Sequence, residues 1–252
     1  YGALEALIYN INRKNPDLRL YEFGNSYRLT DKISDNPHDK YFEESHLMIL
    51  VSGDKYEVNW NSPHAESNFF QLKSYVELVL KRIGFNTENL KTVSTANDFF
   101  SEGLDIISNQ KILVSFGRIH REKTLGFEVK QDVYFADFNW DLVMKEIKKH
   151  EVRFTGLPKY PGVKRDLSLV LEKTVSFDQI RMAAQKAEKK LLRNINLFDV
   201  YEGDKIAAGK KSYAVSFTLR DDEKTLTDHQ IEKIMESILR TIEKETGAQI
   251  RA

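Results

Sequence analysis

Two polar residues near the C-terminal end of the chain, Asp199 and Tyr201, stand two positions apart in a strand-like run. A tyrosine ring can stack on a nucleobase, and a neighbouring carboxylate can accept hydrogen bonds from the edge of that base. Ser212 adds a hydroxyl group at the start of the next strand-like run. The cations that could neutralise phosphates beside them are Lys164, Lys210, Lys211 and Arg220. This combination suits a single-stranded nucleic acid, but it also suits the solvated face of an ordinary antiparallel sheet.

The second half of the chain has a pattern of elements that could hold these side chains on one surface. Two capping boxes, Ser176 to Gln179 and Thr227 to Gln230, each open an amphipathic helix. Strands are expected at 164–171, 195–201 and 211–220, and a short last strand ends at Ile250. The order βαββαβ predicts a ferredoxin-like unit, whose two helices cover one face of the sheet and leave the other face open.

Alternation along the strands predicts which side chains lie on each face. The helix side is expected to hold Leu167, Leu169, Tyr213, Val215, Phe217 and Leu219, with Phe198 and Val200 from the second strand. The open side is expected to hold Asp166, Ser168, Ser212, Ala214, Ser216, Thr218 and Arg220, with Ile195, Leu197, Asp199 and Tyr201. The three residues suited to base binding therefore belong to one predicted surface.

The first half of the chain predicts strands in runs with few helices between them. Helices are expected at 3–11, 68–83 and 142–148, and strands at 18–23, 26–29, 46–51, 112–119 and 132–137. A doubly wound parallel sheet would need a helix between each pair of strands. The pattern therefore predicts an α+β fold with a mainly antiparallel sheet.

Composition limits the class of protein. The 252 residues are enough for two domains, and they include no cysteine, which excludes disulfides, cysteine nucleophiles and cysteine-ligated zinc. No apolar run could span a bilayer and no secretory leader precedes the first helix, so we expect a cytoplasmic protein without a membrane partner. Residues 1–150 carry 19 basic and 22 acidic side chains and residues 151–252 carry 19 and 16, an asymmetry that permits nucleic-acid binding without demonstrating it. The start at Tyr1 suggests a piece of a longer protein.

No catalytic or metal site stands out. The six histidines show no metal-ligand spacing, and the chain has no GxxxxGK[ST] loop, no GxGxxG after a strand and no GxSxG elbow. We therefore expect neither catalytic residues nor a metal site.

Five short motifs in the second half resemble a known module in their order and spacing. They are Pro158–Pro161, Arg165–Ser168, Leu197–Tyr201, Gly209–Ser212 and Leu226–Asp228. Together they are similar to the ferredoxin-fold anticodon-binding module of the bacterial phenylalanine–tRNA ligase beta-subunit family. The resemblance is to the C-terminal region of that family, and it covers essentially the whole chain.

The resemblance implies roles for residues of the predicted open face. It implies that Asp199 and Tyr201, with Ser212, hold the first anticodon base of the tRNA. Tyr201 would stack on the base, and the Asp199 carboxylate would accept from the N–H groups of guanine. Contacts to the tRNA backbone are implied for Lys164, Arg165, Lys210, Lys211 and Arg220.

The first half resembles the family's catalytic-like module, a relative of the class II synthetase core that has lost its chemistry. The segment Leu20–Arg28 is similar to the strand that enters the FRxE motif, whose arginine binds ATP phosphates. Thr30 stands where the glutamate of that motif would be, and Val133–Phe138 has neither glycine nor arginine where a second ATP-binding arginine is expected. The resemblance thus implies a non-catalytic module in which Arg28 is an ion-paired surface residue.

The implied organisation is a degenerate class II synthetase-like domain over 1–150, a connector over 151–163 and an anticodon-binding domain over 164–252. Pro158 and Pro161 should stiffen the connector. The implied function is a part of the ligase that charges tRNA(Phe) with phenylalanine, with a catalytic alpha subunit as partner in an alpha2–beta2 assembly. The complete enzyme would use ATP and Mg²⁺, and this piece would hold no cofactor. Two alternatives stay open, a regulatory ferredoxin-like amino-acid-binding protein and a self-sufficient class II ligase paralogue.

Overall fold

The computed structural model describes residues 1–29, 40–87, 90–147, 156–204 and 206–251. The chain divides into two units, Tyr1–Arg153 and Phe154–Ala252, which are called unit 1 and unit 2 below. Part of the expected connector 151–163 lies outside the described residues. Its last position, Val163, is already the first residue of a strand.

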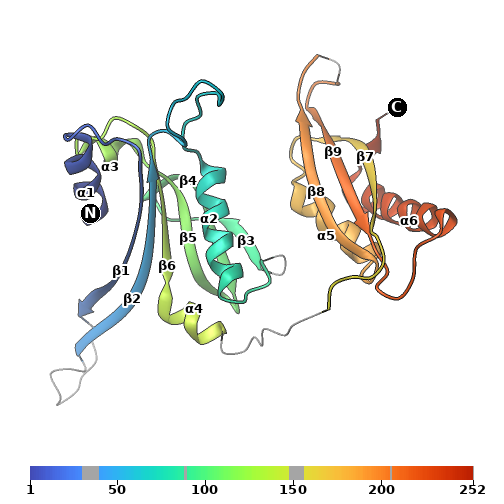
Figure 1. Ribbon diagram of the computed structural model, residues 1–252, viewed down its shortest axis with the longest axis horizontal. Helices are drawn as coiled ribbons and strands as arrows, with labels where there is room; N and C mark the ends of the chain where they lie inside the picture. The colour runs from blue at the N-terminus through green and yellow to red at the C-terminus, as the bar shows by residue number, and fades with distance from the viewer. Residues whose placement is uncertain (30–39, 88–89, 148–155, 205, 252) are drawn as a thin grey trace. The chain divides into compact units, whose positions relative to one another are not determined.

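Unit 1 is built on one antiparallel sheet with the strand order β1-β2-β6-β5-β4-β3 (Figure 1). Its strands are β1 (Leu18–Leu29), β2 (Tyr41–Ser52), β3 (Lys91–Ser94), β4 (Phe100–Ser108), β5 (Lys111–Ile119) and β6 (Val133–Asn139). Its helices are α1 (Gly2–Ile11), α2 (Phe69–Arg82), α3 (Arg121–Leu125) and α4 (Trp140–Ile147). The predicted α+β class with an antiparallel sheet is confirmed.

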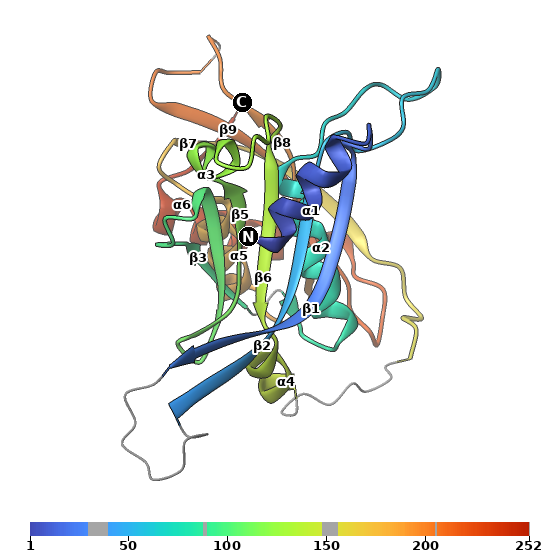
Figure 2. The same ribbon diagram turned by 90° about the vertical axis from the view of Figure 1, so that its left-hand side faces the viewer.

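The two faces of this sheet are covered unequally. On one face, apolar residues of α2 such as Leu72 and Leu80 pack with Phe116 and Phe138 of the sheet, and all four are fully buried. On the other face, α1 packs against a smaller cluster of buried residues. Figure 2 shows α1 lying over only one end of its face. Toward the other end of that face lie the polar side chains of Ser26, His46 and Asp137.

Three elements of unit 1 were not predicted from the sequence, namely β3, β4 and α3. The pairing of β4 with β5 shifts register between Phe100 and Glu102 and again between Ile106 and Ile107, which interrupts the alternation of apolar residues. The two strands expected at 18–23 and 26–29 are one continuous strand, β1, which pairs with β2 along its whole length. The helix expected at 142–148 begins at Trp140, and residue 148 lies outside the described residues.

Unit 2 has the predicted order βαββαβ (Figure 1). Its elements are β7 (Val163–Glu172), α5 (Phe177–Ala187), β8 (Leu192–Tyr201), β9 (Lys210–Leu219), α6 (Asp228–Thr246) and β10 (Gln249–Ile250). The strands form an antiparallel sheet in the order β10-β7-β9-β8, as expected for a ferredoxin-like fold.

The helices of unit 2 begin where the capping boxes predict. The Ser176 hydroxyl accepts from the Gln179 backbone while the Gln179 side chain accepts from the Ser176 backbone, and Thr227 and Gln230 repeat the arrangement. Helix α6 ends at Gly247, whose left-handed backbone (φ 68°) suits glycine. Helix α5 ends at Ala187.

Both helices of unit 2 pack on one face of the sheet. Leu169, Val215 and Phe217 are fully buried there against apolar side chains of α5 and α6. The opposite face carries no helix in the part of unit 2 that the structure describes. Among the described helices of the chain, none is both long and apolar enough to cross a membrane.

Candidate nucleic-acid interface

The strand register of unit 2 brings the three predicted base-binding residues onto one surface. Residues directly opposite each other in an antiparallel pair share a face. Tyr201 pairs with Ser212, and Asp199 pairs with Ala214. Ser168 also pairs with Ala214, from the other side of β9, and its hydroxyl lies 3.5 Å from that of Ser212. These residues lie on the face without helices, which is called the open face below.

A β-bulge in β8 decides which residues of that strand reach the open face. Leu197 pairs with Val215 and Asp199 with Ala214, so Phe198 is an extra residue between them. Upstream of the bulge, Ile195 and Leu197 pack against the helix-side core. The prediction that these two face the open side was wrong.

The bulge also overturns the prediction that Phe198 and Val200 belong to the core. Phe198 is 52% exposed and Val200 is 49% exposed. Val200 pairs with Tyr213 on the helix side, at the edge of the sheet, where the helices leave it uncovered. Simple alternation failed here because the extra residue reverses the phase of the strand from Asp199 onward.

Tyr201 is held between a glycine and an arginine. A Cβ atom at Gly203 would lie only 2.6 Å from the Tyr201 hydroxyl, so a larger residue there would displace the ring. The Arg251 guanidinium lies 5.4 Å from the ring centroid, within cation–π distance. The backbone N–H of Arg251 donates to the Ser168 carbonyl (2.8 Å), which anchors it beside the open face. Sequence reasoning missed Arg251, because only the pairing of β10 with β7 brings it there.

The charges near Tyr201 differ in how far they are neutralised. Lys173 donates to the neighbouring Glu202 at 2.7 Å, and this contact lowers the pKa of the Glu202 carboxyl, which stays ionised but paired. Asp199 is exposed, and no other residue in the described part of the chain forms a hydrogen bond or ion pair with its side chain. Its carboxylate is therefore available to a ligand.

Ser212 occupies a different position from the other two. It is only 4% exposed in the central strand β9, although it shares their face. Its small side chain lies beside Tyr201 across the strand pair. A supporting role under the open face fits this burial better than direct contact with a ligand.

The five cations predicted to contact phosphates divide between the two faces. Lys164 and Lys210 have the parity of the open face, and Arg220 directly follows β9. Lys210 is paired with Glu172 (3.8 Å) and Arg220 with Asp222 (3.1 Å). Arg165 instead pairs with Asp228 at the start of α6 (3.6 Å). Lys211 is 9% exposed, with its ammonium 4.6 Å from the Tyr213 ring centroid on the helix side. Arg165 and Lys211 therefore do not share the open face with Lys164 and Lys210.

The sequence motifs of unit 1 lie on its sheet. The Arg28 guanidinium lies over the Phe42 ring, 4.4 Å from its centroid. Thr30, expected to replace a motif glutamate, lies outside the described residues. The segment Val133–Phe138 is part of strand β6, and its residues are largely buried.

A serine–histidine–aspartate chain crosses the polar end of the unit 1 sheet. The Ser26 hydroxyl lies 3.0 Å from His46 Nε2, and His46 Nδ1 lies 2.8 Å from the Asp137 carboxylate. This is the hydrogen-bond order of an activated serine. Ser26, however, lies inside a regular strand, where backbone N–H groups run in the plane of the sheet and cannot converge on a group bound above it. We interpret the chain as a structural link between β1, β2 and β6.

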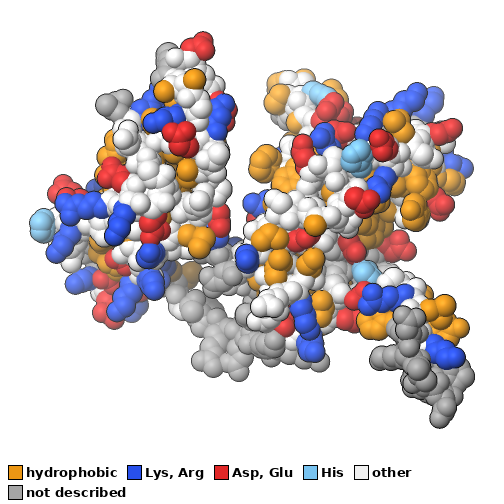
Figure 3. All heavy atoms as spheres, turned by 180° about the vertical axis from the view of Figure 1, so that it is seen from behind, with side chains coloured by type: hydrophobic (Ala, Val, Ile, Leu, Met, Phe, Trp, Pro, Cys, Tyr) orange, Lys and Arg blue, Asp and Glu red, His pale blue; other side chains and the backbone are white. Residues whose placement is uncertain are grey.

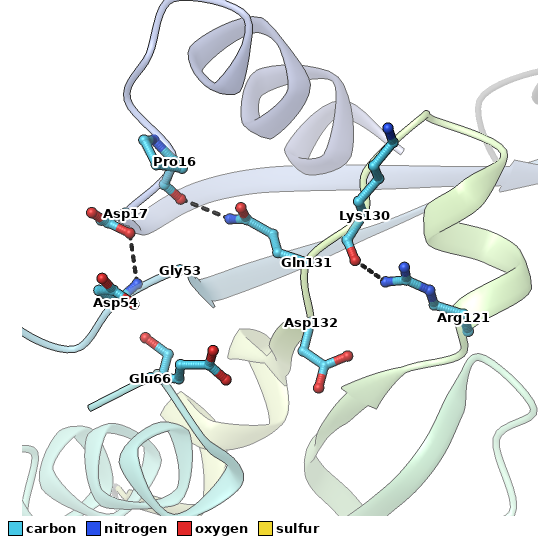
Figure 4. A pocket seen from close by; sticks show the side chains of 10 residues that line it. Pro16, Asp17, Gly53, Asp54, Glu66, Arg121, Lys130, Gln131 and Asp132 are labelled. Atoms are coloured by element: carbon cyan, nitrogen blue, oxygen red, sulfur yellow. Dashed lines mark hydrogen bonds between the residues drawn. The ribbon is translucent and has the colours of Figure 1, made fainter. Parts of the chain in front are cut away.

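A pocket of unit 1 of about 560 Å³ lies among the connections at one end of the sheet (Figure 4). Its carboxylates are Asp17, Asp54, Glu66 and Asp132, and its cations are Arg121 and Lys130. Arg121 donates to the Lys130 carbonyl, and Asp17 accepts from the Asp54 backbone. An acidic lining of this kind disfavours nucleotide phosphates.

The charged side chains of both units are mixed in sign over the faces that Figure 3 shows, in keeping with the zero net charge. Groups of three or more potential metal ligands are absent from the described part of the chain.

Comparison with known proteins gives two family matches. The family described as "Ferredoxin-fold anticodon binding domain" matches residues 158–251, and "Phenylalanyl tRNA synthetase beta chain CLM domain" matches residues 1–140. Among solved structures, that of pyrrolysyl-tRNA synthetase from Desulfitobacterium hafniense is 13% identical, with a TM-score of 0.44 over 59% of this chain and 48% of that one.

Curated relatives match the chain along its whole length. The phenylalanine–tRNA ligase beta subunits of Bacteroides thetaiotaomicron and Porphyromonas gingivalis are each 42% identical over 100% of this chain. The protein of the same name from Fusobacterium nucleatum is 32% identical, also over 100% of the chain. The chain spans 31% of the length of each of these relatives.

Proposed function

Because the chain belongs to the phenylalanine–tRNA ligase beta-subunit family, we propose that it is part of an enzyme that uses ATP to attach phenylalanine to its tRNA. In this proposal unit 2 binds the anticodon of tRNA(Phe), and unit 1 supports a catalytic alpha subunit. The complete enzyme is a cytoplasmic alpha2–beta2 assembly that uses ATP and Mg²⁺. The chain described here contributes recognition and support rather than chemistry.

The observation that carries this proposal is the open face of unit 2. An exposed, unpaired carboxylate (Asp199) and a positioned aromatic ring (Tyr201) lie two residues apart on it. Stacking on an aromatic ring binds any base, whereas hydrogen bonds to the base edge distinguish one base from another. Guanine offers two adjacent N–H donors to a carboxylate and adenine does not, so Asp199 reads guanine at the first anticodon position.

The surrounding residues support that site in different ways. Ser212 lies beneath the face and leaves room for the Tyr201 ring. Arg251, over that ring, supplies a cation to the phosphate beside the bound base. Of the predicted backbone contacts, Lys164 and Lys210 lie on the face that the tRNA approaches, and Arg220 follows the end of β9. Arg165 and Lys211 act instead within unit 2.

The alpha subunit binds unit 1 at the edge strand β1. An apolar groove of about 440 Å³ lies there, and Tyr21, Phe23 and Leu78 line it while remaining 75%, 56% and 60% exposed. Exposed apolar side chains gathered in a groove are typical of a protein contact surface. Co-expression with the alpha subunit tests this assignment. Phe23→Asp should reduce recovery of the complex, and Val58→Asp, which changes an exposed residue outside the groove, should not.

The anticodon proposal is tested with two versions of tRNA(Phe), one with guanine and one with adenine at the first anticodon position. The wild-type chain should prefer guanine, and Asp199→Ala should lose this preference, a change of about 1–3 kcal/mol in binding free energy. Asp166→Ala is the matched control, because it removes another exposed carboxylate from the same face. Full guanine preference in Asp199→Ala would show that this carboxylate is not the reader.

The two alternative functions are separated by simple binding experiments. A regulatory amino-acid-binding domain is not favoured by the anticodon-binding family match over residues 158–251. A self-sufficient ligase would bind ATP through unit 1. We expect no saturable ATP binding by the chain and no effect of Arg28→Ala. ATP binding that this substitution abolishes would favour the ligase alternative.

A further inference from the structure

Phe198, the extra residue of the β-bulge, is a large aromatic side chain that unit 2 leaves uncovered. It is 52% exposed, although it follows Leu197, which packs against the core. The ammonium of Lys164 lies 5.7 Å from the centroid of its ring. This contact joins β8 to β7 across the central strand β9.

The contact with Lys164 places the Phe198 ring on the open face. Lys164 pairs with Thr218, and its neighbour Arg165 points to the helix side, where it meets Asp228 at the start of α6. Lys164 therefore projects from the face without helices, and a ring within cation–π distance of its ammonium lies on the same side.

The bulge is what allows Phe198 and Tyr201 to share a face. Residues three positions apart in a regular strand point to opposite faces. The extra residue changes this parity, so two aromatic rings stand on the open face on either side of Asp199. Each ring has a cation beside it from another part of unit 2, Lys164 of β7 at Phe198 and Arg251, which follows β10, at Tyr201.

We propose that Phe198 and Lys164 form a second base-binding subsite, for the nucleotide next to the one that Asp199 and Tyr201 bind. The proposal rests on the function proposed above and extends it from one base to two. A nucleobase stacks on the Phe198 ring in place of the ammonium, because base stacking is stronger than an exposed cation–π contact. The released ammonium of Lys164 then pairs with the adjoining phosphate.

The second subsite should bind without selecting a base. Asp199 and Tyr201 lie two residues apart on the same face and serve the first base. A phenylalanine ring stacks on a base but offers no hydrogen bonds to its edge. Phe198 should therefore add affinity equally for all bases at the neighbouring position. Selectivity at the first anticodon position should be unchanged by its loss.

The test uses the whole chain and anticodon stem-loops of tRNA(Phe) that carry fluorescent 2-aminopurine on the 5′ or the 3′ side of the first anticodon base. Stacking on a ring quenches this base. With wild-type protein, quenching is expected at one of the two positions. Phe198→Leu should abolish that quenching and weaken binding about 5- to 150-fold, while the preference for guanine at the first position is retained.

Three further variants make the result specific. Phe198→Tyr keeps a ring and should retain the quenching. Val200→Ala alters a residue of similar exposure on the same strand but toward the helix side, and should bind like wild type. Lys164→Gln should keep the quenching and lower the slope of log affinity against log salt by about 0.7.

The outcomes distinguish a failure of the second subsite from a failure of the anticodon proposal on which it rests. If the chain selects guanine but Phe198→Leu binds and quenches like wild type, the second subsite is wrong and the anticodon site stands. If the wild-type chain shows neither binding nor guanine preference, both proposals fall.

Discussion

The two sheets of this chain differ in how their polar faces use hydrogen bonds. In unit 1, the polar end of the sheet is internally paired: His46 links Ser26 to Asp137, and Asn139 donates to Glu44 at 2.6 Å. In unit 2, the open face keeps Asp199 without a partner among the described residues and leaves Phe198 half exposed. Both faces are polar and both lie opposite a helix layer. Unused hydrogen-bonding capacity and exposed rings, rather than polarity, therefore mark the face suited to a ligand.

The largest expected effect tests whether unit 1 and unit 2 unfold independently. Phe217 is fully buried in the core of unit 2, and Phe217→Ala should destabilise that unit by about 3–5 kcal/mol. Both tryptophans, Trp60 and Trp140, belong to unit 1. In thermal unfolding of Phe217→Ala, circular dichroism should therefore show a transition at a lower temperature than in wild type. The transition seen by tryptophan fluorescence should keep its wild-type temperature.

The equivalent substitution in the core of unit 1 serves as the control for this comparison. Phe116→Ala, in the core of unit 1, should shift the fluorescence transition and leave unit 2 folded. A single transition that moves equally in both variants would show that the two units unfold together.

A smaller effect is expected when the stacking ring is removed from the open face. Tyr201→Ala should weaken tRNA binding by about 1–3 kcal/mol, and by the same amount for guanine and adenine at the first anticodon position. Binding titrations with both tRNAs measure this, with Tyr160→Ala as the control outside the sheet. A loss confined to the guanine tRNA would instead make Tyr201 part of the base-edge readout.

Substitutions at the hydrogen-bonded polar end of the unit 1 sheet should change the stability of unit 1 and leave tRNA binding unchanged. His46→Ala removes two hydrogen bonds and should lower the free energy of unfolding of unit 1 by about 1–2 kcal/mol. Its tRNA binding should equal that of wild type. Labelling of Ser26 by a fluorophosphonate that disappears in His46→Ala would contradict the structural interpretation of this link.

The smallest expected effect distinguishes the two faces of unit 2. Lys210→Gln should lower the slope of log affinity against log salt by about 0.7, because Lys210 lies on the open face. The adjacent Lys211→Met should leave the slope unchanged, since that ammonium lies over Tyr213 on the helix side. Equal changes in both variants would contradict the assignment of faces.

The sequence predicts most of unit 2 because its signals are local. The capping boxes at Ser176 and Thr227 begin both helices. Alternation along β9 separates Val215 and Phe217 from Ser212 and Ser216. The positions of Asp199 and Tyr201 were also correct. The predicted faces of Ile195 and Leu197 were wrong, because an extra residue in a strand leaves no mark in composition or periodicity.

Residues that act through distant contacts were the hardest to predict. Arg251 reaches Tyr201 only because a two-residue strand, β10, pairs with β7. Arg165 and Lys211 were grouped with their basic neighbours, yet adjacent residues of a strand point to opposite faces. In unit 1, β4 was missed because its two register shifts break the alternation on which strand prediction depends.

The bulge at Phe198 also constrains how this strand can change over evolutionary time. Deleting Phe198 would make Leu197 and Asp199 consecutive residues of a regular strand, still opposite Val215 and Ala214. Asp199 and Tyr201 would keep their face, and only the Phe198 ring would be lost from it. A lineage can therefore gain or lose this ring by one insertion or deletion, whereas a one-residue insertion between Asp199 and Tyr201 would send these two side chains to opposite faces.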